Sequence, residues 1–409
     1  MSEAQAVNYT SQVFNPLAPE VVANPYDFYR HYRETAPVYK TPLGFWLLTA
    51  HEHVSSVLAD RRFGRDFARE TMVINGPAAM ENPLNIAMSR MVLFLDPPDH
   101  PRIRKLVSKA FSGRRVQDLR PHIGRVATDL LNRVRERGQM DIVADFALPF
   151  PMTVMFDLLG VPESDREYFT RSFRVTSRVL DIIPLTATER KEATEQLNTL
   201  KRYFGDLIEL RRREPAEDLI SSLVQVEEAG DSLSSDELLS NIILLFIAGH
   251  ETTSNAIGNS IYSLYSNQDQ LDELKRHPEN VSAAVDELLR FESPVQLSSR
   301  SALETVEIGG RTIPCGDFVI LALGSANRDP RIYPDADRLI LSRPDVRPLY
   351  FGGGIHFCLG AQLARVELEI ALRTLFDSFP RLRISGMENA VWRPSCVWRG
   401  LQTLRANWA

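Results

Sequence analysis

The sequence predicts a mainly helical fold with small β-sheets, and three observations carry that prediction. Apolar residues keep helical spacing through most of residues 101–277. Ser234 and Glu237 have the spacing of a capping box, in front of an apolar stretch that predicts one helix from Asp236 to about Asn267. At roughly 1.5 Å per residue this helix is about 45 Å long, enough to cross a whole domain. Short strand patterns occur before and after the helical region.

The other elements follow in chain order. Asn24 and Pro25 supply a cap and a first-turn proline for a helix over PYDFYRHYRET. APVYK and GFWLLT predict the strands of a hairpin, and IGRVATDLLNRVRER predicts a further helix. A second hairpin is expected over TVEIGGRTI, with Gly309 and Gly310 in the turn. After a helix from Gly360 to about residue 376, RLRIS predicts a final strand.

Composition places limits on the class of protein. The 409 residues are 44% hydrophobic and 24% charged, which is ordinary for a soluble globular chain. A net charge of −6 argues against a nucleic-acid-binding protein. The three cysteines show no disulfide framework, the N-terminus resembles no secretory signal, and the longest apolar run, near 242–248, is too short to span a membrane. We therefore expect a cytoplasmic protein with no membrane span.

The segment YFGGGIHFCLG, residues 350–360, combines the densest glycine of the chain with Cys358. A phosphate loop would need a lysine, and none is present. A dinucleotide-binding fingerprint would need glycine in place of Phe357, and a nucleophile elbow would need it in place of His356. Zinc sites pair their ligands at short spacing, whereas Cys358 has no neighbouring cysteine. A buried free cysteine that only packs remains open at this point.

One thiolate bond to the metal of a flat macrocycle explains the same segment. Glycines would let the loop lie against the ring because they carry no side chain. The N–H groups of the loop and the positive end of the following helix would stabilise a thiolate. Phe351 could shield the sulfur from water. A thiolate opposite the open position of a haem iron favours O–O cleavage.

The spacing Phe351-x-x-Gly354-x-His356-x-Cys358-x-Gly360 resembles the haem-binding loop of the cytochrome P450 family of haem-thiolate monooxygenases. The resemblance implies that Cys358 is the iron ligand, that the cofactor is haem b (iron protoporphyrin IX), and that Phe351, His356 and Gly360 contact it.

The resemblance runs from NPYDFY, near residue 24, to the C-terminal strands. It implies one helix-rich domain over residues 1–409, built around a buried haem, with residues 1–20 as an extended N-terminal segment. Length alone would suggest two or three domains. The lack of an N-terminal anchor is similar to that of the bacterial, soluble members of the family.

Ala248-Gly249-His250-Glu251-Thr252-Thr253 lies midway along the long predicted helix. A zinc-protease helix is excluded because Ser254 stands where the second histidine would be needed. Glycine and threonine weaken an apolar helix, which suggests a site. The resemblance implies that Ala248 faces the haem and that Glu251 and Thr252 form an acid–alcohol pair, which relays protons to the dioxygen being reduced.

Two further sets of charged residues match family positions. Glu287 and Arg290 are three residues apart on one helix face, a spacing that by itself usually marks an exposed ion pair. The resemblance implies a buried structural pair that ties its helix to the loop before Cys358. It also implies partners for the haem propionates, which need cations or donors when buried: these are His100, Arg104, Arg300 and His356.

These motifs do not identify the substrate. We expect an apolar pocket from the segment before residue 96, the long helix and the segment after Arg290. Its expected wall consists of Met91, Leu93, Leu244, Leu245, Val295 and Leu297, with Met88 and Asn241 nearby. A helical stripe of Arg171, Arg174 and Arg178 could bind a substrate carboxylate or could be a solvated face. Fatty-acyl, terpenoid and polyketide-type substrates all remain open for hydroxylation or epoxidation.

Partners are expected as well. No flavin or iron–sulfur segment is recognisable, so electrons should come from NAD(P)H through a separate ferredoxin and ferredoxin reductase, with O2 as co-substrate. The basic stretch 102–115 could be the docking surface for an acidic ferredoxin, or it could be only a solvent-exposed surface. We expect a monomer.

Other functions remain as alternatives. A non-catalytic haem-thiolate sensor would not need the acid–alcohol pair, and neither would a peroxide-driven peroxygenase. A cysteine hydrolase lacks the elbow glycine and a dedicated histidine.

Overall fold

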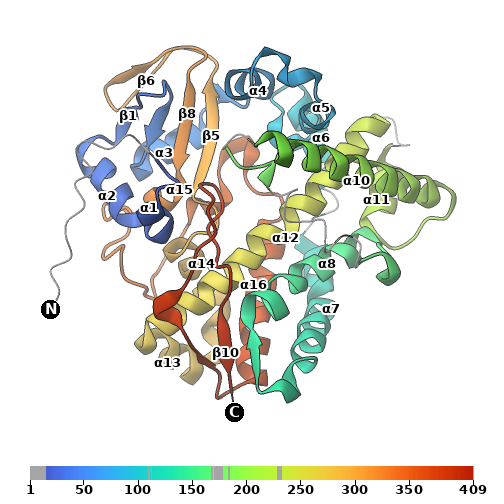
Figure 1. Cartoon of the computed structure of the whole chain (residues 1–409), viewed down its shortest axis with the longest axis vertical. Helices are drawn as coiled ribbons and strands as arrows, with labels where there is room; N and C mark the ends of the chain where they lie inside the picture. Colours follow the sequence, from blue (N-terminus) through green and yellow to red (C-terminus); the bar gives the residue numbers. More distant parts are fainter. Residues whose placement is uncertain are drawn as a thin grey trace.

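The computed structural model describes residues 15–108, 111, 113–166, 169, 178–182, 185–227 and 233–408. Helices form most of the molecule. The largest sheet lies at the upper left of Figure 1, whereas the sheet that contains the C-terminal strand Arg405–Asn407 lies at the bottom. The helices are α1 (Pro19–Ala23), α2 (Pro25–Thr35), α3 (His51–Ala59), α4 (Phe67–Asn75), α5 (Pro83–Met88), α6 (Asp99–Ser108), α7 (Gly113–Asn132), α8 (Pro149–Leu159), α10 (Ala187–Arg213), α11 (Leu219–Glu227), α12 (Ser235–Ser266), α13 (Gln268–Arg276), α14 (Val281–Phe291), α15 (Leu323–Ala326) and α16 (Ala361–Ser378). This architecture confirms the mainly helical class with small sheets.

Three sheets are present among the described residues. The largest has the strand order β1-β2-β8-β5-β3, in which only the β2–β8 pair is parallel. Its strands are β1 (Val38–Lys40), β2 (Trp46–Leu48), β3 (Phe63–Gly64), β5 (Leu297–Ala302) and β8 (Phe318–Ala322). The others comprise β4 (Gln139–Asp141), β10 (Arg405–Asn407) and β9 (Arg383–Ile384), and the hairpin of β6 (Val306–Ile308) and β7 (Arg311–Ile313). Both predicted hairpins are confirmed.

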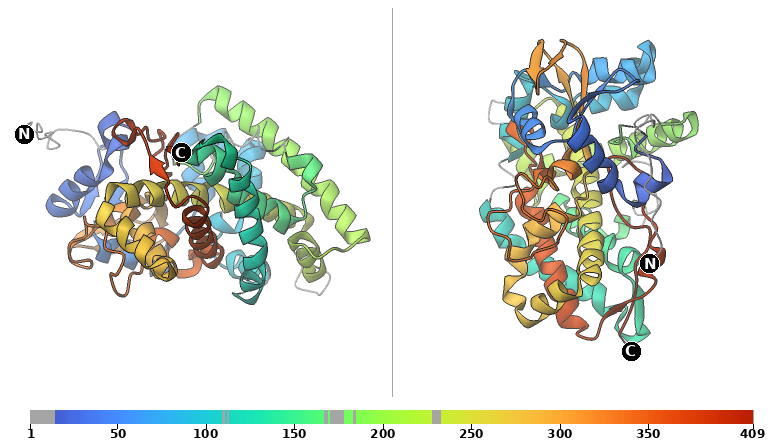
Figure 2. Two further views of the ribbon diagram at one scale, coloured as in Figure 1. Left: turned by 90° about the horizontal axis from the view of Figure 1, so that it is seen from below. Right: turned by 90° about the vertical axis from the view of Figure 1, so that its left-hand side faces the viewer.

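Helix α12 runs through the middle of the molecule, and its start is the predicted one (Figures 1 and 2). The hydroxyl of Ser234 accepts from the N–H of Glu237 at 3.2 Å, while a carboxylate oxygen of Glu237 accepts from the N–H of Ser234 at 2.7 Å. This capping box satisfies two N–H groups that would otherwise lack partners. Most of the helix is buried, against α8, α10 and α16. It therefore provides a rigid wall at the molecular centre.

Glu287 and Arg290 lie on α14, and both side chains are 0% exposed. Arg290 donates to Glu287 through Nε at 2.7 Å and Nη2 at 2.9 Å, and to the carbonyl oxygens of Asn327 and Ala336 through Nη1. Arg343 adds a second cation 3.2 Å from Glu287. A buried charge is stable only when its hydrogen-bonding groups have partners. The partners of Arg290 include carbonyl groups of the chain that leads into the Cys358 segment, so the cluster ties α14 to that chain.

One window, Ile142–Leu159, is long and apolar enough to cross a membrane by length and composition. It consists of a π-helical turn over Ile142–Ala147 followed by α8, and 61% of it is buried inside the protein. It packs against α7 and α12. The window is therefore part of the helical core.

Candidate active site

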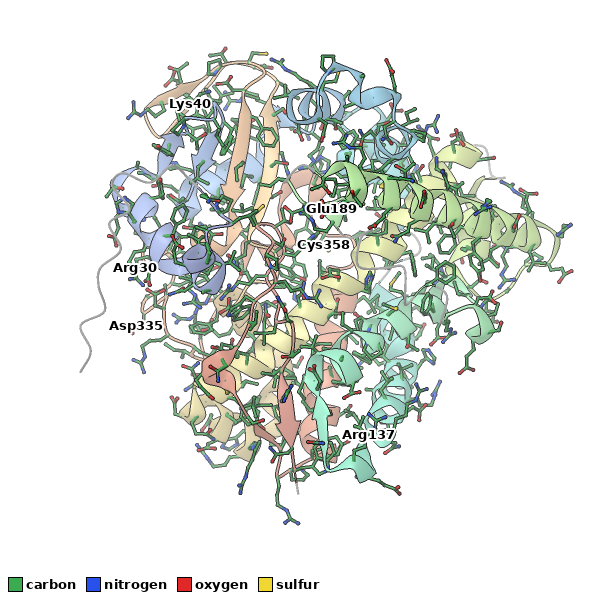
Figure 3. The ribbon with its side chains drawn as sticks, viewed as in Figure 1. Arg30, Lys40, Arg137, Glu189, Asp335 and Cys358 are labelled. Atoms are coloured by element: carbon green, nitrogen blue, oxygen red, sulfur yellow. The ribbon has the colours of Figure 1, made fainter. Side chains whose placement is uncertain are left out.

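Cys358 lies near the centre of the molecule, whereas Arg30 and Arg137 lie at its edge (Figure 3). The segment before it forms two short 3-10 turns, Leu349–Phe351 and Gly354–His356, and α16 starts just after Gly360. The N–H of Cys358 donates to the carbonyl oxygen of Phe351 at 2.8 Å, which closes the loop. The guanidinium of Arg365 stacks on the Phe351 ring, 4.3 Å from its centre. These contacts hold the sulfur at the start of a helix.

The Cys358 thiol has opposing electrostatic influences. Burial raises its pKa, while a hydrogen bond from the N–H of Gly360 and the positive charges of Arg104 and Arg365 lower it. Arg104 also donates to the carbonyl oxygen of Phe357 at 2.5 Å, so this arginine braces the loop. A soft cation bound at the sulfur would add the positive charge that a buried thiolate needs.

The glycines also serve a purpose that the sequence did not indicate. A Cβ on Gly354 would lie 2.4 Å from the carbonyl oxygen of Leu58 on α3, and its φ of +61° is unfavourable for other residues. Gly352 also has a positive φ, +71°. A Cβ on Gly360, by contrast, would meet no atom within 4 Å. The glycine run therefore lets the loop turn tightly and approach α3, while Gly360 leaves space on the cavity side.

Two cavities meet over Cys358. We call inner the one of about 260 Å³ that reaches Arg104, His356, Gly360 and Glu367, and outer the one of about 310 Å³ that extends toward α4 and the start of α10. Both are lined by Arg65, Leu93, Ala248, Thr252, Val295, Ser298, Tyr350, Phe351 and Cys358. The sulfur and the middle of α12 therefore face one continuous space.

At the inner cavity and just behind its wall are buried nitrogen atoms with no hydrogen-bond partner among the described residues. They are Nε2 of His356 and Nε of Arg65, which line the cavity, and both ring nitrogens of His100, which lies against His356 behind that wall. The two histidine rings lie 4.5 Å apart, centre to centre, and His356 is 3.8 Å from Asp96, too far for a hydrogen bond. Burial, followed by the charge of Arg65, lowers the pKa of Arg300 to about 9. Because orphaned donors and crowded cations are costly, this wall fits a ligand with carboxylates.

Haem meets that description, since its two propionates would offset part of the positive charge of Arg65, Arg104 and Arg300 and accept from the histidines. His100, Arg104, Arg300 and His356 were expected at such a wall from the sequence. Arg65 was not, and no local pattern around it marks a binding residue. The residues present therefore fit a haem with its propionates toward this wall and its iron at Cys358.

Glu251 and Thr252 are adjacent on α12 but point to different surroundings. Thr252 lines both cavities, and its hydroxyl donates to the carbonyl oxygen of Ala248 at 3.2 Å. Glu251 is buried and lines neither cavity. Its carboxylate accepts from Arg393 at 2.6 Å and from Asn255 at 3.4 Å. Arg393 belongs to the C-terminal segment, so the partner of Glu251 lies 142 residues away in sequence.

Gly249 completes this stretch of α12. A Cβ at that position would lie 2.6 Å from the sulfur of Met155, so the glycine allows α8 to approach. Both residues line the inner cavity. The weak helix formers thus provide close packing as well as space.

Two further residues at the cavities were missed in the sequence. Tyr350 lines both, and burial raises its pKa. Glu367 lines the inner cavity, and burial raises its pKa well above the usual range. A signal for Glu367 exists, because residues 360, 363, 364 and 367 share one helix face and all line the inner cavity.

The expected substrate wall is distributed over both cavities. Leu93 and Val295 line both, Leu244 and Leu245 line the inner one, and Leu297 lines the outer one. Met91 is instead packed in the core at 2% exposure, and Met88 lines the outer cavity. Asn241 hydrogen-bonds the N–H of Val92 and the carbonyl oxygen of Arg90, so it anchors the segment rather than facing a ligand.

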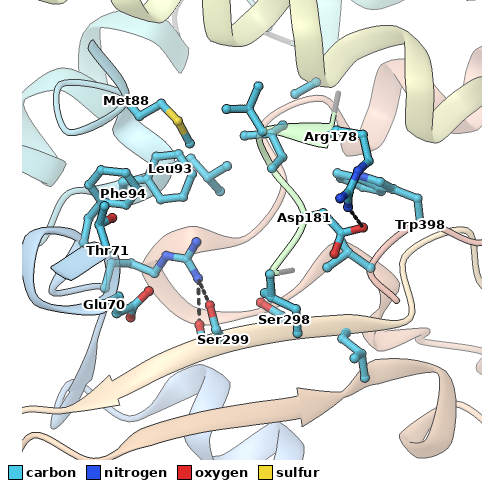
Figure 4. Close-up of a pocket in the computed structure, with 18 of the residues that line it drawn as sticks. Glu70, Thr71, Met88, Leu93, Phe94, Arg178, Asp181, Ser298, Ser299 and Trp398 are labelled. Atoms are coloured by element: carbon cyan, nitrogen blue, oxygen red, sulfur yellow. Dashed lines mark hydrogen bonds and ion pairs between the residues drawn. The ribbon is translucent and has the colours of Figure 1, made fainter. Parts of the chain in front are cut away.

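The basic residues singled out in the sequence are largely engaged. Arg102 forms ion pairs with Glu237 at 2.5 Å and Asp99 at 3.1 Å, and Arg104 points inward. Arg171 and Arg174 lie outside the described residues. Arg178 lines the outer cavity, where it is paired with Asp181 (Figure 4).

Comparisons with known proteins agree with this geometry. A family model described as Cytochrome P450 matches residues 20–388. The 6-deoxyerythronolide B hydroxylase of Saccharopolyspora erythraea is 39% identical over 392 residues, covering 92% of this chain and 95% of the relative. The structure of P450BioI in complex with a hexadec-9Z-enoic acid ligated acyl carrier protein is similar with a TM-score of 0.89 at 36% identity, covering 95% of this chain and 100% of that one. The myxobacterial cytochrome P450 CYP267B1 in complex with myristic acid is similar with a TM-score of 0.87 at 35% identity, covering 96% and 98%.

Proposed function

The chain belongs to the cytochrome P450 family and is a haem-dependent monooxygenase, and from this premise we propose that it inserts one atom of O2 into a lipophilic small molecule. The reaction is hydroxylation or epoxidation of a fatty-acyl, terpenoid or polyketide-type substrate. The mostly apolar wall of the two cavities supports such a substrate. A relative named for a hydroxylation of 6-deoxyerythronolide B and a similar structure that holds myristic acid support the same range.

The observation that carries the proposal is the position of Cys358 beneath Ala248 and Thr252 in one continuous space. Cys358 would bind the iron of haem b, while His100, Arg104, Arg300, His356 and Arg65 would hold the propionates. The bound haem supplies the centre at which dioxygen is reduced and cleaved. The protein excludes bulk water there, because aliphatic side chains surround the space.

The proton supply follows from the two sides of α12. Thr252 presents its hydroxyl to the cavity, where it can hold a water molecule and pass a proton from it. Glu251 must draw protons from the side of Arg393, whose side chain is 25% exposed. The ion pair with Arg393 holds Glu251 turned from the cavity, so the pair must open before Glu251 can reach toward Thr252.

Family members receive electrons from redox partners, and we propose a ferredoxin with its reductase here. Ile355 and Phe357, on the segment that carries Cys358, are 40% and 43% exposed and offer a short path to the iron. Lys105 on α6 is adjacent to this segment, because its neighbour Arg104 bonds Phe357. We further propose a cytoplasmic monomer folded as one domain.

The test is the spectrum of the ferrous carbon-monoxide complex. Wild-type protein should show the strongly red-shifted Soret band of thiolate ligation, and Cys358→Ala should lose it. Cys315→Ala, which removes an exposed thiol far from the cavities, should keep the band. Purified protein should form product only when ferredoxin and reductase accompany NAD(P)H. An unchanged spectrum in Cys358→Ala would rule out the assignment.

A further inference from the structure

The charges that line the outer cavity do not balance. Arg65, Arg178 and Arg190 contribute positive charge, whereas Glu70 and Asp181 contribute negative charge. The rest of that wall is mostly apolar. A cavity with one cation in excess fits a ligand with one anionic group, provided that the excess charge resides on an identifiable side chain.

Arg178 does not carry the excess. Its Nη1 lies 3.2 Å from Asp181 and its Nε lies 3.5 Å from Glu189, so two carboxylates face it (Figure 4). Asp181 is itself 0% exposed and accepts from Ser395 at 2.6 Å. This arginine is therefore a structural partner of Asp181 and Glu189.

Arg65 makes its contacts where the outer cavity meets the inner one. Its Nη1 donates to the carbonyl oxygen of Ser299 at 2.7 Å and to the hydroxyl at 3.0 Å, and it lines the inner cavity as well. Its charge also lowers the pKa of Glu70, against the burial that raises it. Arg65 is thus matched by Glu70 and by the propionate side of the inner cavity.

Arg190, on the first turn of α10, keeps an uncompensated charge. Its Nη2 donates to the side-chain oxygen of Asn75 at 3.0 Å and to the carbonyl oxygen of Leu185 at 3.4 Å, and both acceptors are neutral. Within the described part of the chain, Arg190 forms no ion pair. Arg190 therefore keeps a positive charge that no carboxylate of the described residues pairs.

The contact with Asn75 also fixes the direction of its amide. The amide oxygen faces the guanidinium, so the amide N–H groups turn the other way. Arg190 keeps its Nε and Nη1 donors for a ligand, and Asn75 keeps Nδ2. Both residues line the outer cavity and are only half-buried, so a bound anion would remain partly hydrated. The arrangement has the donors that a carboxylate requires.

We propose that Arg190 and Asn75 bind the carboxylate of an aliphatic acid whose chain lies along the apolar wall toward Cys358. The wall between the two ends includes Leu84, Met88, Leu93, Phe94, Leu185 and Val295. The inference rests on the monooxygenase function proposed above and selects the substrate class: free monocarboxylic acids with a long apolar body, oxidised at a carbon remote from the carboxylate.

The test is a spectral titration of the haem-loaded protein with tetradecanoic acid and with its methyl ester, following the shift from low to high spin. Wild type should bind the acid about 10-fold more tightly than the ester, because the ester lacks the negative charge that strengthens a hydrogen bond from Arg190. Arg190→Gln should weaken acid binding about 10-fold and leave the ester unchanged. Arg190→Lys should retain part of the preference.

Two further variants separate charge from packing. Asn75→Asp keeps Arg190 but places a carboxylate beside it, and it should weaken acid binding as Arg190→Gln does. Arg202→Gln makes the same change in charge on the outer face of α10, where Arg202 contacts Thr199, and should bind both ligands as wild type does.

Equal affinity for acid and ester, or unchanged acid binding in Arg190→Gln, would overturn the carboxylate site. So would the absence of a shift with acids of graded chain length. In each case an intact red-shifted carbon-monoxide band would leave the monooxygenase function standing, whereas its loss in wild type would defeat that function itself. The band also shows that each variant is folded around its haem.

Discussion

The inner and outer cavities share lining residues around Cys358 but differ in the hydrogen bonding of their polar groups. At the wall of the inner cavity, His356 and Arg65, with His100 behind them, keep buried nitrogen atoms without partners among the described residues. In the outer cavity, Arg178 and Asp181 bond each other, and Arg190 has neutral acceptors. Unsatisfied buried donors are costly, so the inner wall is built for a group that stays bound. The donors that Arg190 and Asn75 keep for a ligand in the outer cavity are only half-buried, so water can satisfy them when the site is empty, which suits a site that fills and empties.

The largest effect is expected from the buried charges that support the inner cavity. Arg290→Met leaves Glu287 buried, with only Arg343 as a cation, and should lower the free energy of unfolding by roughly 3–5 kcal/mol. Urea unfolding and the carbon-monoxide band report this loss. The matched control is Arg276→Met, which breaks an exposed pair with Glu273 at the same spacing and should change stability by about 0.5 kcal/mol or less. Equal effects would contradict a special role for burial.

The second prediction contrasts one arginine from each cavity. Arg300→Gln removes a buried cation from the propionate wall and should speed transfer of haem to an excess of haem-free myoglobin by roughly 10-fold. Arg190→Gln changes the same charge in the outer cavity and should leave the transfer rate unchanged. If both variants released haem alike, the distinction between a cofactor wall and a substrate wall would fail.

The third prediction sharpens the contrast between the two sides of α12. Thr252→Ala removes a hydroxyl that faces the cavities, so product per NAD(P)H should fall several-fold while hydrogen peroxide rises, within the ~10²-fold range of general-acid effects. Glu251→Gln should instead slow oxygen consumption itself, because proton supply from the Arg393 side is cut. Product and peroxide per NAD(P)H are measured. Full coupling in Thr252→Ala would mean that another group supplies the proton.

The smallest effect concerns pH. Burial, and then the charge of Arg104, lowers the pKa of His100 below the 6.5 of the unfolded chain. The unfolded chain therefore binds the proton more readily, and stability contributed by neutral His100 is complete above pH 6.5 and lost as pH falls toward the folded pKa. In haem-free protein, His100→Phe should flatten this decline in urea unfolding between neutral and mildly acidic pH. An identical decline in both proteins would assign it to other groups.

The sequence indicated the inner cavity better than the outer one, for a physical reason. A tight loop under a helix needs particular residues at fixed spacing, so Gly354, Cys358 and Gly360 form a local pattern. Helix α12 was also foreseeable, since Ser234 and Glu237 satisfy its first turn within four residues. Such contacts join residues close in sequence, so they produce a recognisable local sequence pattern.

Contacts between segments that are distant in sequence produce no local sequence pattern. Arg393 reaches Glu251 from 142 residues away, and nothing in the surrounding sequence marks either as the partner of the other. Met88 and Met91 were both expected at the pocket but only Met88 lies there, because the segment joining them changes from α5 to a 3-10 turn and no single period applies. Arg190 and Asn75 are brought together only by the tertiary fold.

The C-terminal segment holds two contacts only two residues apart. Arg393 bonds Glu251, the expected source of protons, and Ser395 bonds Asp181 in the segment that precedes α10 and borders the outer cavity. One short stretch of chain therefore supports both the ion pair of Glu251 and the wall of the outer cavity. A substitution that shifts the backbone between Arg393 and Ser395 would alter both contacts at once.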